Sequence, residues 1–362
     1  MKSIASMLTI TALGFGLLGC PGSGGGGGGG GSTPGFAVST TAADFGVVGN
    51  AYTSTLAATG GTAPFTWTLF GGGLPTGLSL TAGTGVVSGT PGIPAGNFNA
   101  TFTVTDSTGR TATGSVLFAI HTRTDRVSVD GTGTAGNGIS SAPSINGDGI
   151  LVAFVSQSTN FVTGVNGSQI YVHNRQTNQI DLVSRDNSAS IVNEGTGVSS
   201  APSISADGRY VAFVSLATNL LAPGAAVPAG QQIYVRDRQT GLTSLVSVDN
   251  NVAPNPGTGV SSAPSISADG RYVAFVSLAT NLLAPGVPAV AGQQIYVRDR
   301  QLAQSFLASQ DNTNTNVEGT GGVSDTPSMN SNGGFVAFRS QATNLVTTPP
   351  SAPSDIYVRA LP

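Results

Sequence analysis

The sequence predicts an all-β protein in which a two-sheet sandwich precedes a β-propeller of four blades. Two tripeptides recur about every 60 residues along the second part of the chain, a spacing longer than that of helical solenoid repeats. Glycine (52 residues) and proline (20) are abundant, and 39% of the residues are apolar while 9% are charged. Such a composition is unlike that of disordered chains and fits many short strands joined by tight turns.

The charge pattern argues against a nucleic-acid partner. The net charge is −3, the only lysine is Lys2, and the sequence contains no basic run. Proteins that bind nucleic acids neutralise phosphates with clustered Lys and Arg side chains. We therefore expect a partner of another class.

The N-terminus has the features of an export signal. Residues 1–20 carry one basic side chain, Lys2, and then an apolar stretch too short to span a membrane as a helix of the mature protein. The stretch ends at Gly19 and at Cys20, the only cysteine of the chain, in a pattern that resembles the lipobox of bacterial lipoproteins. This resemblance implies that Cys20 is lipidated, and Pro21 in place of aspartate implies the outer membrane. An ordinary signal peptide with a chance cysteine is the alternative.

Residues 21–35 form the expected linker. Gly24–Gly31 is an unbroken run of glycine, which behaves as a flexible coil. We expect this linker to hold the folded part of the chain away from the lipid surface.

Residues 36–121 predict the sandwich. Apolar side chains alternate with polar ones along 98–104 and 116–120, as in strands that bury one face. The only tryptophan, Trp67, should anchor the core between the two sheets.

The same segment resembles bacterial immunoglobulin-like domains related to dystroglycan-type cadherin modules. The resemblance rests on Gly60–Trp67, Gly73–Leu78, Gly85–Pro91 and Phe102–Asp106. It implies a spacer or an adhesive module. Asp106 is interpreted as a turn-capping residue; calcium ligation, as in cadherins, is the alternative, although no acidic cluster accompanies it.

Residues 122–362 contain the repeat. Ala-Pro-Ser begins at Ala142, Ala201 and Ala263, with Thr326 at the fourth position, and Ile-Tyr-Val begins at Ile170, Ile233, Ile295 and Ile356. One unit predicts four antiparallel strands in sequence order, at 201–205, 210–215, 233–238 and 244–248. Asp207-Gly208 predicts a tight hairpin turn between the first two. Four such strands make one propeller blade.

The repeat begins and ends out of phase. Arg126–Val129 resembles the fourth strand of a unit but precedes the first complete one, and the last unit stops after its third strand, at Arg359. We expect these two segments to pair and close the ring, which would hide its open edges. An open array, or a ring completed by a second molecule, are the alternatives.

The repeat resembles the TolB-like, WD40-like (PD40) propeller repeat. The resemblance rests on Ser205–Phe213 with Ile233–Asp237, and on Ser267–Phe275 with Ile295–Asp299; it is weaker at Asn146–Phe154 and Asn330–Phe338. It implies a propeller domain that presents an interaction surface.

Few residues could carry catalysis or bind a metal. The two histidines are His121, at the domain boundary, and His173, which replaces the arginine of the other units at a position expected to face outward. No motif for a metal, a phosphate loop or a serine hydrolase occurs, so we expect no catalytic residue, metal or cofactor.

The recurrent polar residues have simpler interpretations. We expect turn residues at Asp148, Asp207 and Asp269, and caps of the following loop at Asn160, Asn219, Asn281 and Asn344. Calcium binding by the asparagine loops is the alternative. Arg236 and Arg238 are expected to form hydrogen bonds at the blade edge, with a role in ligand binding as the alternative.

These features predict a lipid-anchored envelope protein that binds a protein or glycan, with the long loops as its contact surface. It would contact the membrane through its lipid anchor alone. A periplasm-facing scaffold, suggested by the TolB-like resemblance, and a carbohydrate-active enzyme are the alternatives. The sequence identifies neither the ligand nor the side of the envelope.

Overall fold

The computed structural model describes residues 35–122, 124–187, 193–222, 224–225, 228–284, 290–312, 318–347 and 353–361. The expected signal peptide, the lipidation site Cys20 and nearly all of the glycine linker lie outside these residues. The described part consists of strands, turns and loops, which confirms the all-β class, and it contains no helix able to cross a membrane.

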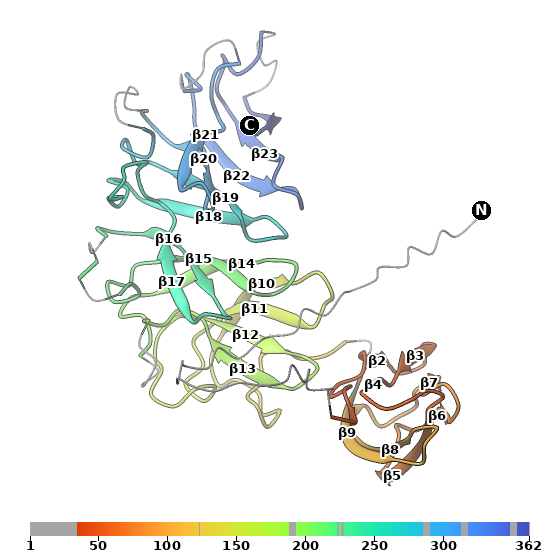
Figure 1. Cartoon of the computed structure of the whole chain (residues 1–362). Helices are drawn as coiled ribbons and strands as arrows, with labels where there is room; N and C mark the ends of the chain where they lie inside the picture. Colours follow the sequence, from red (N-terminus) through yellow and green to blue (C-terminus); the bar gives the residue numbers. More distant parts are fainter. Residues whose placement is uncertain are drawn as a thin grey trace, which may run out of the picture.

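The first domain is a sandwich of short strands. They are β1 (Ala37–Val38), β2 (Gly46–Val47), β3 (Tyr52–Thr55), β4 (Ala58–Thr59), β5 (Thr66–Gly72), β6 (Leu78–Thr81), β7 (Val86–Gly89), β8 (Gly96–Thr105) and β9 (Thr111–His121). One sheet has the order β2-β9-β8-β5 and the other β3-β7-β6, while β1 pairs with β4. Figure 1 shows this domain beside the lower end of the remaining chain.

The core of the sandwich is the one expected from the alternation. Trp67 is 3% exposed and packs among buried side chains from both sheets. Along β8 and β9 the inward positions Phe102 and Phe118 are fully buried, with their ring centroids 6.1 Å apart. The period-two pattern therefore identified the buried face of both long strands.

The rest of the chain folds into four antiparallel sheets. The first contains β10 (Ser140–Ile145), β11 (Leu151–Ser156), β12 (Gln169–Asn174) and β13 (Gln179–Leu182); the second β14 (Ser199–Ile204), β15 (Tyr210–Ser215), β16 (Gln232–Asp237) and β17 (Leu242–Leu245); the third β18 (Ser261–Ile266), β19 (Tyr272–Ser277), β20 (Gln294–Asp299) and β21 (Gln304–Leu307); the fourth β22 (Ser324–Met329), β23 (Phe335–Ser340) and β24 (Asp355–Ala360). Each sheet follows sequence order, as predicted.

Local sequence explains each hairpin. Gly208 has a φ of +70°, and the Asp207 carboxylate accepts hydrogen bonds from the Arg209 N–H (3.0 Å) and the Ser205 hydroxyl (2.6 Å). The expectation that Asp207 is a turn residue is confirmed. The first strand of each unit carries a β-bulge, at which Ala201 has the unusual φ of +49° just before a proline. No sequence pattern indicated this bulge.

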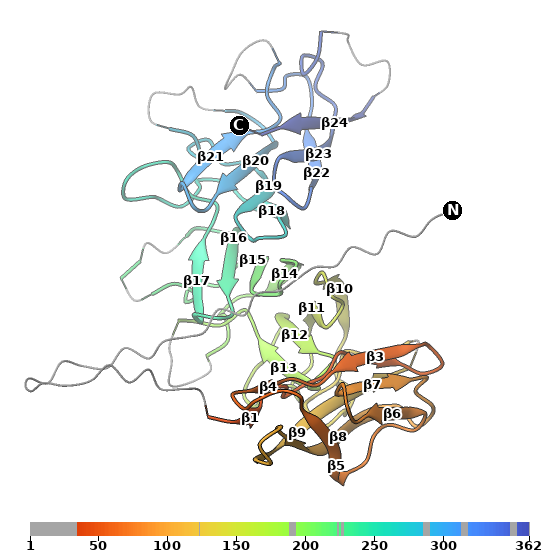
Figure 2. The same ribbon diagram turned by 45° about the vertical axis from the view of Figure 1, so that its right-hand side comes forward.

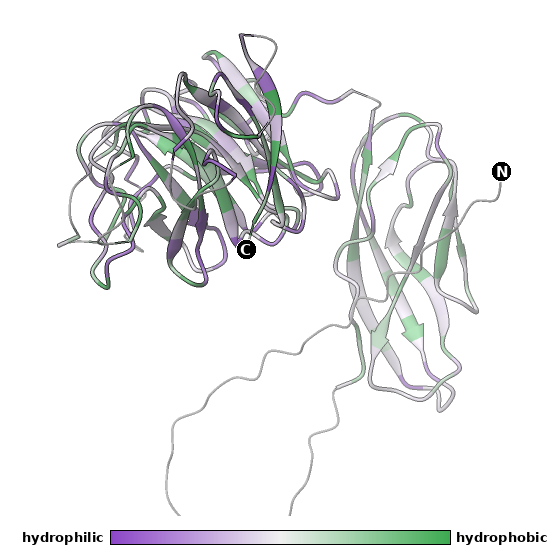
Figure 3. Ribbon diagram, turned by 90° about the horizontal axis from the view of Figure 1, so that it is seen from above, coloured by the Kyte–Doolittle hydropathy of each residue, from purple (hydrophilic) through white to green (hydrophobic). Residues whose placement is uncertain are grey.

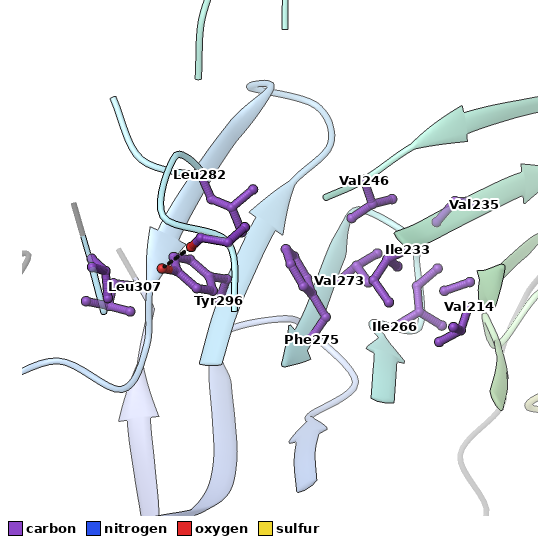
Figure 4. Close-up of a cluster of buried hydrophobic side chains, with 13 residues drawn as sticks. Val214, Ile233, Val235, Val246, Ile266, Val273, Phe275, Leu282, Tyr296 and Leu307 are labelled. Atoms are coloured by element: carbon purple, nitrogen blue, oxygen red, sulfur yellow. Dashed lines mark hydrogen bonds between the residues drawn. The ribbon is translucent and has the colours of Figure 1, made fainter. Parts of the chain in front are cut away.

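Successive sheets pack face to face. Between the second and third sheets, Val214, Ile233 and Val235 meet Val273 and Phe275, all of them almost fully buried (Figure 4). In addition, the side chain of each Ala-Pro-Ser serine bonds to the next sheet. Its hydroxyl accepts a hydrogen bond from a backbone N–H about 60 residues ahead, in the pairs Ser144–Ile204 (3.1 Å), Ser203–Ile266 (3.1 Å) and Ser265–Met329 (2.9 Å).

The predicted closure of the ring is wrong in this structure. Figures 1 and 2 show the four sheets stacked in a row, with the first and fourth at opposite ends. Val129 bridges to Ala135 instead of pairing with β24, and β24 hydrogen-bonds to β23 on one side only within the described residues. Because the same head-to-tail interface repeats without returning to its start, it generates an open row. A four-bladed propeller is therefore not seen.

Local bonds explain why the leading segment stays with the first sheet. The Asp130 carboxylate accepts hydrogen bonds from the N–H groups of Thr132 (2.8 Å) and Thr134 (2.9 Å), which folds the segment back on itself. Asn178, in the turn between β12 and β13, donates to the carbonyl oxygen of Gly131 (3.3 Å). These contacts place residues 126–131 against their own unit. Figure 3 looks along the row, with the first domain at its side.

Candidate functional site

One edge of the row presents two exposed polar side chains in every unit, and in the second and third units these are two threonines whose hydroxyls face each other. In the second sheet the hydroxyls of Thr196 and Thr218 lie 3.1 Å apart, and in the third those of Thr258 and Thr280 lie 3.3 Å apart. We call this set the threonine edge, and its exposed members are Asn137 and Thr159, Thr196 and Thr218, Thr258 and Thr280, and Thr320 and Thr343.

The recurrent asparagine builds the threonine edge. Asn219 accepts a hydrogen bond from the Thr196 N–H (2.8 Å) and donates one to the Glu194 carbonyl (2.9 Å). It therefore joins the loop after the second strand to the segment that precedes the first strand. The prediction that Asn219 caps its own loop is wrong. The equivalent residues Asn160, Asn281 and Asn344 make the same pair of bonds.

The threonine edge can bind polar, uncharged groups. Hydroxyls and amides both donate and accept hydrogen bonds, and face-to-face sheets lie about 10 Å apart. The edge is thus a periodic row of neutral hydrogen-bonding groups on a rigid scaffold, a type of position in which binding residues are common.

A second candidate lies at the boundary of the two domains, with Asp125 at its centre. The Asp125 carboxylate accepts hydrogen bonds from the Arg175 guanidinium (2.7 Å), His121 Nδ1 (3.0 Å) and the Thr122 hydroxyl (2.7 Å). The Arg175 guanidinium also lies over the ring of Phe45, 5.6 Å from its centroid. The junction therefore ties the first domain to the first sheet of the row.

Both histidines line a cavity of about 490 Å³ at this junction. His121 donates from Nδ1 to Asp125, and its buried Nε2 has no hydrogen-bond partner in the described structure. His173 Nε2 lies 3.0 Å from the Asn178 side-chain oxygen; because Asn178 uses its amide nitrogen on Gly131, we assign Nε2 as the donor. The Nδ1 of His173 is then an acceptor, and it too is buried without a partner in the described part of the chain.

Burial and charge set the protonation of these groups. Burial lowers the pKa of His121, although Asp125 opposes the shift, and burial likewise lowers the pKa of His173. Burial alone would raise the pKa of Asp125, but hydrogen bonds from Arg175 and Thr122 outweigh it and the pKa is lowered. At neutral pH the junction thus holds two uncharged imidazoles beside an ionised carboxylate.

The junction does not have the make-up of a metal centre. No group of three or more His, Cys, Asp or Glu residues that could hold a metal occurs in the described ranges. The one carboxylate beside the histidines, Asp125, is already engaged by the Arg175 guanidinium.

His173 and its equivalents were expected to face outward, and this prediction is wrong. Arg236, the equivalent in the second sheet, is 2% exposed. Its guanidinium donates to the Asp186 carbonyl (3.1 Å) and the Asn187 side chain (3.2 Å), both in the loop of the preceding unit. Burial lowers the pKa of Arg236 to about 10. The position therefore binds one unit to the one before it.

Arg175 occupies a second repeated arginine position, which Arg238 and Arg300 hold in the second and third units. Arg175, Arg238 and Arg300 each donate to a turn carbonyl of their own unit, and Arg238 also pairs with Asp181 of the first sheet (2.7 Å). In the first unit, which has no preceding sheet, the same arginine pairs with Asp125. Arg236 and Arg238 therefore form hydrogen bonds, but not at the edge of a propeller blade as predicted: each bonds both within its own unit and to the preceding unit.

The remaining predicted residues have structural roles. The buried Asp106 carboxylate accepts from the N–H groups of Thr108 (3.0 Å) and Arg110 (3.0 Å) and pairs with the Arg110 guanidinium (2.8 Å). These hydrogen bonds lower its pKa even though burial opposes the change. The turn-capping interpretation of Asp106 is confirmed, as are those of Asp148 and Asp269.

Comparisons with known proteins identify part of the chain. No curated protein matches. Among solved structures, the alignments include a DUF4784 family protein from Bacteroides caccae (8% identity, 91% of this chain and 84% of that one, TM-score 0.26), extracellular cadherin domains 3–6 of protocadherin gamma B2 (14%, 75% and 71%, TM-score 0.21) and the human desmocollin-1 ectodomain (10%, 89% and 68%, TM-score 0.19). TM-scores this low support no argument about function. Residues 33–121 match the family model described as "Putative Ig domain", and the first domain is therefore immunoglobulin-like.

Proposed function

We propose that this protein is a lipid-anchored binding or adhesion protein of the bacterial cell envelope. The immunoglobulin-like domain would act as a stalk, and the row of sheets would present the contact surface. The lipobox-like Cys20 supports the anchor, and the matched immunoglobulin-like domain supports an extracellular type of architecture. The role is one of binding, not catalysis.

The threonine edge is the observation that carries this proposal. It places neutral hydroxyls and amides at regular intervals along four units, in a chain of which 9% of the residues are charged. An extended partner with repeating polar groups could contact several units at once and gain affinity from each. A neutral glycan chain fits this chemistry best.

Binding can be tested with the full-length chain on a glycan array. The double substitution Thr218→Lys and Thr280→Lys should weaken binding at least tenfold, because it puts two charges on the edge. Thr240→Lys is the matched control, since Thr240 is also exposed but lies in the turn at the opposite end of its sheet. Equal binding by all three proteins would exclude the edge as the contact surface, and capture of a protein by the edge instead of a glycan would redefine the ligand.

Location can be tested separately by protease treatment of intact cells. A surface protein should be shaved from whole cells, whereas a periplasmic one should be cut only after permeabilisation. Replacing Cys20 with Ser should release the protein from the membrane fraction if the lipid is its anchor.

A further inference from the structure

The last sheet of the row leaves an apolar strand uncovered. Ile356 and Val358 of β24 are 72% and 67% exposed, whereas their equivalents in the second sheet, Ile233 and Val235, are fully buried against the third sheet. Phe335 on the neighbouring β23 is 49% exposed. The surface that joins one unit to the next in the other sheets is therefore open at this end.

The backbone edge of β24 is open as well. In the second sheet, Ile233 donates its N–H to the Ser247 hydroxyl (3.0 Å), and its carbonyl accepts from Val246 (2.8 Å), just beyond the fourth strand. The same two bonds form at Ile170 and Ile295. The fourth sheet has no such strand among the described residues, so the backbone groups of Ile356, and by alternation those of Val358, point into the open side.

A second copy cannot cover the fourth sheet by placing its own first sheet there and continuing the row head to tail. At the first sheet, Phe154 and Tyr171 are buried under their own loop, with the Phe161 ring centroid 5.3 Å from that of Tyr171. That end is also joined to the immunoglobulin-like domain through Asp125 and Arg175. A second copy stacked head to tail would meet a surface that is already covered.

The sequence of β24 is instead complementary to itself. In an antiparallel pair of two β24 strands with Tyr357 opposite Tyr357, Asp355 faces Arg359 of the other copy, and Ile356 faces Val358. The parity also fits, because the outward backbone groups of Ile356 then oppose those of Val358 as a hydrogen-bonded pair. Opposite charges and apolar pairs at facing positions both stabilise a sheet.

We propose that β24 is a homodimer interface, at which a second copy of this chain supplies the strand that the fourth sheet lacks. The two three-stranded sheets become one continuous six-stranded sheet across a two-fold axis, an isologous contact. The pairing satisfies the open edge, which in an exposed apolar strand is otherwise a site of uncontrolled association. The interface is independent of the threonine edge and of its ligand.

Charge reversal tests the proposal. Sedimentation velocity of the full-length chain in detergent should show a dimer, and Asp355→Arg should weaken association at least tenfold, because the introduced arginine would then face Arg359 of the other copy at both ends of the paired strands. Arg359→Asp should act in the same way, and the double variant should restore the dimer. Leu242→Lys is the control, since Leu242 is an exposed apolar strand residue away from this end.

A cysteine at the two-fold axis tests the register. Tyr357→Cys should form an intermolecular disulfide under mild oxidation, while Val358→Cys should form far less, because Val358 faces Ile356 and not itself. The unsubstituted chain, with Cys20 as its only cysteine, sets the background. A monomeric wild-type chain, single reversals without effect, or failure of the double reversal to restore association would each overturn the proposal.

Discussion

The ring of Tyr210 in the second sheet lies against Gly270 in the hairpin turn of the third, so closely that a Cβ on the glycine would overlap the ring. The same contact joins Leu151 to Gly208. Gly208 and Gly270 thus each have two functions: they adopt a positive φ, and they leave room for a side chain of the preceding unit.

Gly270→Ala should therefore destabilise the protein more than Gly149→Ala. Both glycines have a positive φ (+72° and +75°), so both variants bear a backbone cost of about 1–2 kcal/mol. At Gly149 the nearest atom to a Cβ is 3.8 Å away, whereas at Gly270 the Tyr210 ring must move, which adds about 1–3 kcal/mol. Urea denaturation measures the difference; equal losses would show that the inter-sheet contact is not tight.

Ser203→Ala should destabilise the row, and Ser328→Ala should not. Ser203 accepts a hydrogen bond from the Ile266 N–H of the next sheet (3.1 Å), and removing it leaves that buried N–H unpaired, at a cost of about 1–3 kcal/mol. Ser328 occupies the same repeat position in the last sheet, which no described sheet follows. Its loss should change the free energy of unfolding by less than about 0.5 kcal/mol. If both variants lose a similar free energy of unfolding, the serine acts within its own strand and not through its hydrogen bond to the next sheet.

The sequence predicted the strands and turns, which depend on neighbouring residues, but not the arrangement of the sheets, which depends on contacts between distant residues. The strand Tyr210–Ser215 and the Asp207-Gly208 turn follow from alternation and turn chemistry, and they appear as expected. The packing of one sheet on the next includes contacts such as Ser144–Ile204, which join residues about 60 positions apart and have no local signature. For that reason the repeat was recognisable while the choice between ring and row was not.

The same limit applies to the candidate site. The recurrence of Asn219 signalled a structural role, but its partner, Thr196, lies in the segment before the first strand and could not be chosen from the sequence. The arginines at the positions equivalent to His173 predict an exposed side chain there, because charged residues are seldom buried without hydrogen bonds. Arg236 shows the exception: it is buried and donates hydrogen bonds to the loop of the preceding unit and to Thr243 of its own sheet.

Arg236→Met should weaken the row, with Arg359→Met as the matched control. Methionine keeps an apolar stem but loses the hydrogen bonds to the Asp186 carbonyl and the Asn187 side chain, a loss of about 1–3 kcal/mol. Arg359 holds the same repeat position but is only half-buried, with one described bond, to Asn312 (3.3 Å). Its substitution should cost less than about 0.5 kcal/mol by urea unfolding at a protein concentration low enough for the chain to be monomeric, where the proposed contact between Arg359 and Asp355 of a second copy does not contribute. A larger loss of stability for Arg359→Met than for Arg236→Met would contradict the role of Arg236 in joining two units.

The titratable groups of the junction should make the free energy of unfolding of the protein fall in two phases as the pH is lowered. The pKa values of His121 and His173 are lowered in the folded protein, so the unfolded chain takes up protons first, and the free energy of unfolding falls as the pH drops below about 6.5. The pKa of Asp125 is lowered too, so its contribution is complete above about pH 4 and is lost as the pH falls through its folded value. His173→Gln can keep the bond to Asn178 without titrating. In urea denaturation at a series of pH values, it should reduce the first phase and leave the second in place. If it leaves the first phase at full size, His173 does not titrate at the junction as described.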